Sequence, residues 1–164
     1  MEKFQENLAQ AIKNLQIADH MAYVTYPLVN EKRLLLKIFD EIYKSIIGCI
    51  NAILNYEYLY KRIRLYKENN DNMQTFMDKC AKNYGLTNKQ IKEIKEILEL
   101  NKQHNQSAME FVKKDKIIIL SDNLGTRTIN IQKIKEYLLL AKELLMITNN
   151  KTEQTESHKN KIYI

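Results

Sequence analysis

The strongest constraint on the fold is an apolar stripe that runs from Leu35 to Ile63 at helical spacing. Further apolar residues make nearly every face of the segment between Ile42 and Leu54 hydrophobic, as is typical of a helix at the centre of a bundle. The 164-residue chain has three Gly and one Pro, too few for the many turns of a β-sandwich or barrel. The sequence therefore predicts a mainly α fold, an up-and-down bundle of four to five helices.

The same periodicity places the helices around this centre. A first helix is expected over residues 3–26, because Pro27 removes a backbone donor and disfavours helix before it. The central helix is then expected over residues 31–66, with Asn30 as its N-cap. Three further helices are predicted over residues 71–83, from the capping box of Thr87 and Gln90 to about residue 112, and over residues 131–148.

The remaining segments show other patterns. β-Branched residues on either side of the turn-forming residues 121–125 predict a short β-hairpin near residues 116–131. Residues 149–164 are polar and unpatterned, which predicts a disordered tail after a single helical-bundle domain of residues 1–148.

Several classes of protein lack the residues that they need. Gly48, Gly85 and Gly125 are too scattered to form a nucleotide-binding loop, and no G-x-S-x-G nucleophile motif is present. Cys49 and Cys80 have no metal-ligand spacing around them, so neither a metal nor another cofactor is expected. No motif in the sequence marks a catalytic residue.

The sequence also predicts a location. The N-terminus has no secretory apolar region, and the longest uncharged apolar run, residues 45–54, is far shorter than the roughly 20 residues that span a membrane. We therefore expect a soluble, cytoplasmic protein without membrane contact or disulfides.

Two basic segments are candidates for nucleic-acid binding in this chain of net charge +6. Tyrosine rings can stack on bases while cations neutralise phosphates. The candidate residues are Tyr58, Lys61, Arg62, Arg64, Lys67, Lys113, Lys114 and Lys116. The alternative is structural, because the tyrosines of residues 56–67 also continue the core stripe and cations suit a helix C-terminus.

A polar interruption breaks the apolar stripe of the fourth helix. Asn101 and Asn105 occupy stripe positions, His104 lies between them, and Glu110 follows. A His beside a carboxylate can carry out acid–base chemistry near neutral pH. However, residues six apart on a helix face different ways, so His104 and Glu110 need a bend or the following loop to meet. We interpret these four residues as a candidate polar site, with surface or interface roles as the alternative.

The order of long and short helices resembles the HEPN superfamily. More narrowly, an uncharacterised group of small archaeal proteins is similar to this chain in two stretches, Ala18 to Leu28 and Glu110 to Lys116. The resemblance covers about residues 5–147. It implies a dimeric helical bundle that acts in RNA cleavage or as the partner of a nucleotidyltransferase. The ribonucleases of that superfamily carry Arg, four to six residues, and then His; no Arg–His pair here has that spacing. The resemblance therefore implies a non-catalytic binding role.

Three functional hypotheses follow from the sequence. The first is a non-catalytic helical-bundle module that forms a homodimer or docks a protein partner, because the central helix is apolar all round. The second is an RNA-binding protein that uses the basic, tyrosine-rich segment 56–67. The third is a divergent HEPN-type ribonuclease centred on His104.

Overall fold

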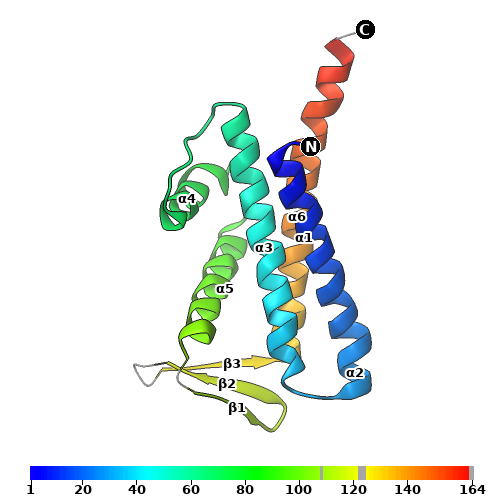
Figure 1. Ribbon diagram of the computed structural model, residues 1–164, viewed down its shortest axis with the longest axis vertical. Coiled ribbons are helices and arrows are strands. Elements are labelled where there is room, and N and C mark those ends of the chain that lie inside the picture. The colour runs from blue at the N-terminus through cyan, green and yellow to red at the C-terminus, as the bar shows by residue number, and fades with distance from the viewer. Residues whose placement is uncertain (108, 122–124, 163–164) are drawn as a thin grey trace.

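Three long helices lie side by side along the molecule, and a small sheet crosses one end of them (Figure 1). The computed structural model describes residues 1–107, 109–121 and 125–162, with the side chains of the last helix up to Glu153. In chain order the elements are α1 (Lys3–His20), the π-helical turn η1 (Met21–Thr25), α2 (Tyr26–Val29), α3 (Leu34–Leu59), α4 (Asn69–Thr75), the π-helical turn η2 (Phe76–Cys80), α5 (Asn88–Gln106), β1 (Met109–Lys113), β2 (Lys116–Leu120), β3 (Thr126–Asn130) and α6 (Ile131–Ile162). The predicted mainly α fold with a short β element is confirmed.

The centre of the fold is α3, whose buried side chains span a broad face, while Lys37, Lys44 and Asn51 lie on an exposed stripe. Phe39 and Ile53 are fully buried, and α1, α5, α6 and η2 pack around the helix. The chain thus covers most of the apolar surface of its own central helix. The predicted end at residue 66 is wrong, because the helix ends at Leu59 and Lys61 adopts a left-handed backbone conformation with φ of 58°.

The α1 and α3 helices approach each other closely at Gly48. The position that a Cβ atom would take on Gly48 lies 2.9 Å from the Cβ atom of Ala11. Beside it, the fully buried Ser45 hydroxyl donates a hydrogen bond of 2.9 Å to the backbone carbonyl of Ala11. Small residues on both helices therefore set the spacing of the bundle.

The predicted end of the first helix before Pro27 is wrong. The helix passes through η1 into α2, and Pro27 follows the π-helical turn as the second residue of α2, so it continues the helix instead of ending it. The helix ends instead at Asn30, whose φ is 53°. Asn30 is therefore the C-cap of α2 rather than the predicted N-cap of the central helix, because Asn tolerates a left-handed backbone.

The chain between α3 and α5 follows the predicted local signals in part. The predicted helix over residues 71–83 is present as α4 and η2, and Gly85 has the left-handed φ of 79° expected after a helix end. The capping box is confirmed: the Thr87 hydroxyl accepts from the Gln90 N–H at 3.1 Å, and the Gln90 side chain accepts from the Thr87 N–H at 2.9 Å. A helical run that reaches residue 112 is wrong, since α5 ends at Gln106.

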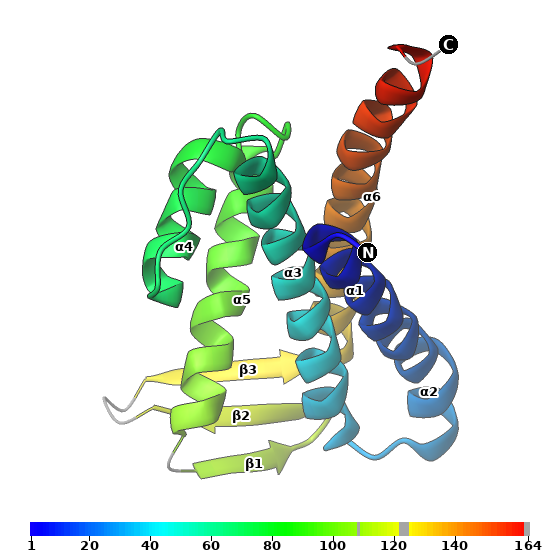
Figure 2. The same ribbon diagram turned by 45° about the horizontal axis from the view of Figure 1, so that its top comes forward.

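The sheet lies beneath α5 and α3, as the turned view shows (Figure 2). It is antiparallel with the order β1-β2-β3, and Ile117 of β2 pairs with Val112 on one side and with Ile129 on the other. The predicted hairpin is β2–β3, although residues 122–124 of its turn lie outside the described residues. Strand β1 was not expected, because its half-exposed residues continue the apparent helical stripe.

The last helix is longer than the sequence indicates. Residues 149–162, interpreted as a disordered tail, belong to α6. Thr148 and Thr152 are buried, and their hydroxyls donate to the carbonyls of Leu144 and Thr148 one turn earlier. Because internally bonded threonines continue the buried face, a count of apolar residues ends the helix too early.

Candidate functional site

His104 and Glu110 meet at the junction of α5 with the sheet. The chain leaves the helix after Gln106, Ser107 is extended, and β1 returns Glu110 to the His104 ring, which contacts its carboxylate through Nδ1. On the other side of the ring, Nε2 lies 3.5 Å from Oδ1 of Asp40 on α3. The following loop thus brings the two predicted residues together. Asp40 was missed by the sequence analysis, since nothing local connects it to His104.

This cluster is better suited to joining elements than to catalysis. The His104 ring has a carboxylate beside each of its two nitrogens, so it links α5 to β1 and to α3. Burial raises the pKa of Asp40, and Glu41 and Glu110 add to that effect, against the opposing charges of His104 and Lys44.

Asn101 and Asn105, the other two predicted site residues, line a groove rather than the His104 cluster. The groove has a volume of about 750 Å³ and runs between α3, α4 and α5. Its apolar side chains come from all three sides and include Ile47, Met73 and Leu98. The polar interruption of the α5 stripe therefore faces an open groove, which explains why those positions are not apolar.

One wall of the groove shows an asparagine bound to the main chain. The Oδ1 atom of Asn72 accepts from the backbone N–H of Tyr66 at 2.7 Å, and its Nδ2 atom donates to the backbone carbonyl of Tyr66 at 2.9 Å. Asn72 thereby fixes the loop between α3 and α4. The sequence showed no signal for this pairing beyond an asparagine-rich loop.

Arg62, a predicted nucleic-acid-binding residue, is part of an internal cluster. Its guanidinium binds Glu57 through Nε at 2.5 Å and Nη2 at 3.0 Å, and it lies over the rings of Tyr56 and Tyr60, with centroids at 5.5 and 5.0 Å. The Tyr84 hydroxyl also donates to Glu57, at 2.7 Å. The left-handed turn at the end of α3 makes this arrangement possible, so a continuous helix could not predict it.

The pKa shifts agree with a stable ion pair. Although burial raises the pKa of Glu57, the hydrogen bonds from Arg62 and Tyr84 and the nearby positive charges lower it below its ordinary value. The hydrogen bond to Glu57 raises the pKa of Arg62. This arginine is therefore committed to a structural contact and is a poor ligand for phosphate.

The two basic segments lie at opposite ends of the molecule (Figure 1). Tyr58, Lys61, Arg64 and Lys67 are exposed at the end where α3 stops. The other candidates belong to the opposite end, at the turn between β1 and β2, where Lys114 has a left-handed φ of 56°. That set is Lys113, Lys114 and Lys116. They do not form one continuous surface with the first segment.

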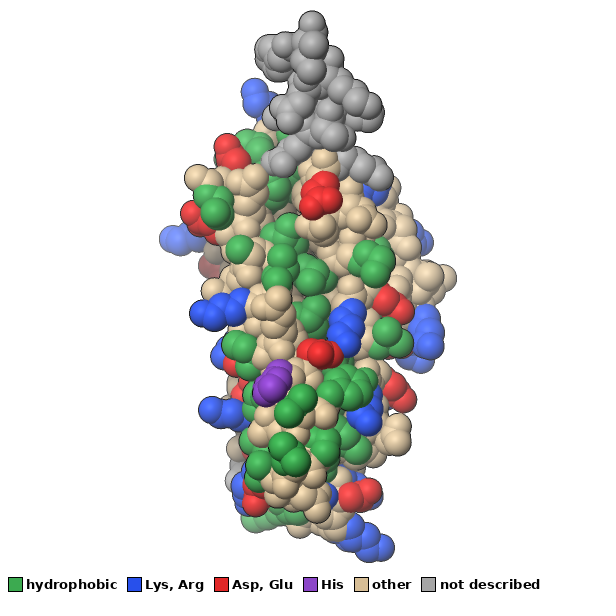
Figure 3. Space-filling view, turned by 90° about the vertical axis from the view of Figure 1, so that its right-hand side faces the viewer, with side chains coloured by type: hydrophobic (Ala, Val, Ile, Leu, Met, Phe, Trp, Pro, Cys, Tyr) green, Lys and Arg blue, Asp and Glu red, His purple; other side chains and the backbone are tan. Residues whose placement is uncertain are grey.

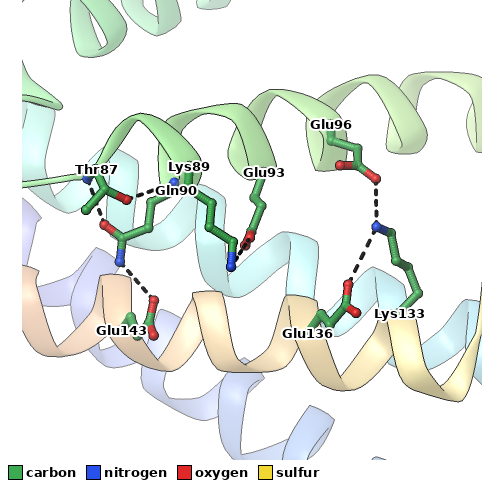
Figure 4. A network of polar contacts seen from close by, with 8 residues as sticks. All are labelled: Thr87, Lys89, Gln90, Glu93, Glu96, Lys133, Glu136 and Glu143. Carbon is green, nitrogen blue, oxygen red and sulfur yellow. Dashed lines mark hydrogen bonds and ion pairs between the residues drawn. The ribbon is translucent and has the colours of Figure 1, made fainter.

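A polar network joins α5 to α6 (Figure 4). Gln90 donates to Glu143 at 2.8 Å, and Lys133 lies 3.2 Å from Glu96 and 3.5 Å from Glu136. The two pairs that join the helices, Gln90 with Glu143 and Glu96 with Lys133, are far apart in sequence, so no local pattern could predict them. Positively and negatively charged side chains pair with one another here, so the network links α5 to α6 structurally.

An exposed apolar surface covers the side of the molecule formed by α1, η1, α2 and α6. We call it the α1–α6 face and define it by six exposed residues: Ile17, Tyr23, Val24, Leu28, Leu139 and Met146. Lys135 and Lys142 of α6 lie over the Tyr23 ring at 5.3 and 5.5 Å, and helical spacing puts them on one stripe with Leu139 and Met146. Figure 3 shows hydrophobic side chains exposed on this side, among charged ones.

Other features concern metals, thiols and membranes. Within the described ranges, no group of three His, Cys, Asp or Glu residues is placed to hold a metal ion. Cys49 and Cys80 are buried free thiols, and burial raises their pKa values to about 12 and about 11. A search of the helices in the described part of the chain finds none with the length and apolarity that crossing a bilayer requires.

Comparison with known proteins gives no relative. Neither a family model, nor a curated protein, nor a solved structure matches this chain. The resemblance to the HEPN superfamily therefore stays a prediction, and functional proposals rest on the surfaces described above.

Proposed function

We propose that this chain is a non-catalytic helical interaction module that forms a homodimer through the α1–α6 face. The observation that carries the proposal is the exposure of large apolar side chains on adjacent elements: Leu28 is 81% exposed and Met146 is 64% exposed. Exposed apolar side chains that gather on one side of a protein, as on the side drawn in Figure 3, mark interaction sites in water. The broad buried face of α3 is not available for this role because α1, α5, α6 and η2 cover it, and Tyr43 and Ile47 of α3 line the groove instead.

A second copy of the chain is the partner that the charges favour. The α1–α6 face carries both signs, since Lys142 lies 2.5 Å from Asp19 and Lys135 lies beside Tyr23. A two-fold interface places the same patch on both subunits, so a patch of one charge sign would repel its copy. A mixed apolar and charged patch avoids that repulsion.

The test is the oligomeric state of the full chain. We expect sedimentation equilibrium to show a dimer, and Leu28→Lys to weaken it by placing a charge in the interface. Leu59→Lys is the matched control, because Leu59 is also an exposed leucine near a helix end, 43% exposed, but lies at the other end of the molecule. A wild-type chain that remains monomeric refutes the dimer, and a dimer insensitive to Leu28→Lys refutes the assignment of the face.

RNA binding is the second candidate function, supported by exposed rings beside exposed cations. Tyr58 is 54% exposed and Tyr66 is 50% exposed, and Arg64 and Lys67 are exposed near them. We expect salt-dependent binding of single-stranded RNA that Arg64→Glu weakens. Arg62 is unsuitable for this test, since its loss disturbs the cluster with Glu57. Binding that is unaffected by salt would contradict this candidate.

A further inference from the structure

The groove between α3, α4 and α5 is bordered by side-chain amides on two sides. Asn69, Asn70 and Asn72 come from α4, and Asn101, Asn105 and Gln106 come from α5. Its volume of about 750 Å³ is that of a ligand site, which typically measures about 300–1,000 Å³. Polar side chains above an apolar base are also typical of such sites.

A carboxamide has the same donor and acceptor groups as a peptide unit. Each Asn or Gln side chain offers N–H donors and a carbonyl acceptor without charge. The charged residues that border the groove are Lys95, Lys102 and Glu99, of mixed sign. This chemistry favours a neutral ligand with both donors and acceptors over a phosphate-rich ligand, which needs concentrated positive charge.

The contact of Asn72 with Tyr66 shows how these amides can bind. One carboxamide accepts from the N–H and donates to the carbonyl of the same residue, at 2.7 and 2.9 Å. A neighbouring β-strand satisfies a residue of an extended chain in a similar paired way. The groove therefore already contains one main-chain contact of the kind that a bound peptide would need.

On the opposite wall, two amides are available for the same contact. Asn101 and Asn105 are four residues apart, so they lie on one face of α5, and neither side chain makes a hydrogen bond to the residues that the structure describes. Met73, Met77 and Leu98 provide apolar surface between the walls. Methionine side chains adapt to differently shaped partners.

We propose that this groove binds an extended polypeptide segment of a partner protein. Asn101 and Asn105 pair with main-chain N–H and carbonyl groups of the segment, while Met73 and Leu98 receive apolar side chains from alternate positions. The helices α4 and α5, which line the groove, lie on the other side of α3 from α1 and α2 (Figure 1). The proposal therefore extends the interaction role and does not depend on the dimer.

The experiment begins with a phage-displayed library of random dodecapeptides, selected on the immobilised full chain. We expect enriched peptides to be uncharged at their centre, with apolar residues at alternate positions. The strongest peptide is then labelled with fluorescein and titrated by fluorescence anisotropy. Asn101→Leu and Asn105→Leu should each weaken binding about tenfold, the loss expected when a buried hydrogen bond is removed.

Two controls separate main-chain recognition from other effects. Asn88→Leu makes the same substitution at an exposed position of α5 that does not line the groove, and it should leave the affinity unchanged. Methylating the central main-chain nitrogens of the peptide should abolish binding, since it removes the donors and keeps the side chains. Asn105 is exposed, so Asn105→Leu decides the question even if Asn101→Leu destabilises the fold.

Three results would overturn the proposal. The first is a library that yields no peptide with affinity for the full chain. The second is a selected peptide that binds equally well after Asn105→Leu or after methylation of its main chain. The third is binding of a fluorescein-labelled oligouridine that Asn105→Leu abolishes, which would assign the groove to unpaired RNA instead.

Discussion

Replacing Gly48 with Ala tests the close approach of α1 and α3, on which the bundle depends. The added methyl group would lie 2.9 Å from the Cβ atom of Ala11, 3.2 Å from the backbone oxygen of Asn7 and 3.3 Å from the Cα atom of Ala11. Two of these neighbours are backbone atoms, so rotation of a side chain cannot relieve the contact. The helices must move apart, which disturbs the packing along their length.

Two opposing effects set the change in the free energy of unfolding that Gly48→Ala causes. Overpacking a filled core costs about 1–3 kcal/mol, whereas Ala favours a helix interior over Gly by roughly 1 kcal/mol. Because backbone atoms are involved, we expect the upper part of the first range, hence a net loss of about 1–2 kcal/mol in the free energy of unfolding. For a domain of this size, that loss lowers the melting temperature by roughly 2–8 °C.

The assay is urea unfolding followed by far-ultraviolet circular dichroism. Gly48→Ala should lower the midpoint without changing the slope, as expected for a change in stability alone. In a double-mutant cycle, Ala11→Gly removes the nearest contact and should give a favourable coupling of at least about 0.5 kcal/mol with Gly48→Ala. A Gly48→Ala variant as stable as the wild type, or the absence of coupling, would refute the predicted approach of the two helices.

Three further predictions concern polar contacts. Glu57→Gln should lower the free energy of unfolding by about 1 kcal/mol, after allowance for solvent screening of Arg62. Because the folded pKa of Glu57 is lowered, this contribution is present above the ordinary pKa of 4.5 and is lost as the pH falls through the lower folded pKa. A stability deficit of the variant that persists in acid would contradict this. Burial raises the pKa of Asp40 above its ordinary value of 3.8. The stability of Asp40→Asn relative to the wild type should therefore increase as the pH rises from 3.8 through the raised pKa. Urea titrations in which the two proteins differ by the same free energy of unfolding at every pH would contradict this. Thr87→Ala should lower the free energy of unfolding by about 1 kcal/mol because it removes the N-cap of α5, whereas Thr87→Ser should keep most of that stability. Equal melting temperatures for the two variants would exclude the capping role.

Sequence patterns predicted the parts of the fold that depend on neighbouring residues. The spacing of apolar residues identified the buried α3, the capping box located the start of α5, and β-branched residues located the β2–β3 hairpin. The predicted helix ends at residues 26 and 66 were wrong for a different reason. A π-helical turn that packs against α3 and α6 carries the first helix past residue 26. The left-handed Lys61 ends the second helix, and the backbone hydrogen bond from the Arg62 N–H to the Glu57 carbonyl closes that end.

The candidate site was predictable only in its composition. The interruption of an apolar stripe pointed to Asn101, His104 and Asn105, and the requirement for a loop between His104 and Glu110 was correct. Asp40 lies 64 positions before His104 in the chain, so its contact exists only after α3 and α5 have packed. The contact of Arg62 with Glu57 could not be predicted from a continuous helix, because Glu57 comes within reach only where the helix stops.

The two proposed surfaces make separable contributions to binding. A dimer formed through the α1–α6 face would leave the groove uncovered in each subunit, since α4 and α5 lie on the other side of α3 (Figure 1). One dimer would then present two grooves, and a partner with two copies of the recognised segment would bind with higher avidity than a single segment. Leu28→Lys would remove this gain and leave the affinity for one peptide unchanged, whereas Asn105→Leu would weaken both. The proposed dimer would thus set the number of sites, and the proposed groove would set what each site recognises.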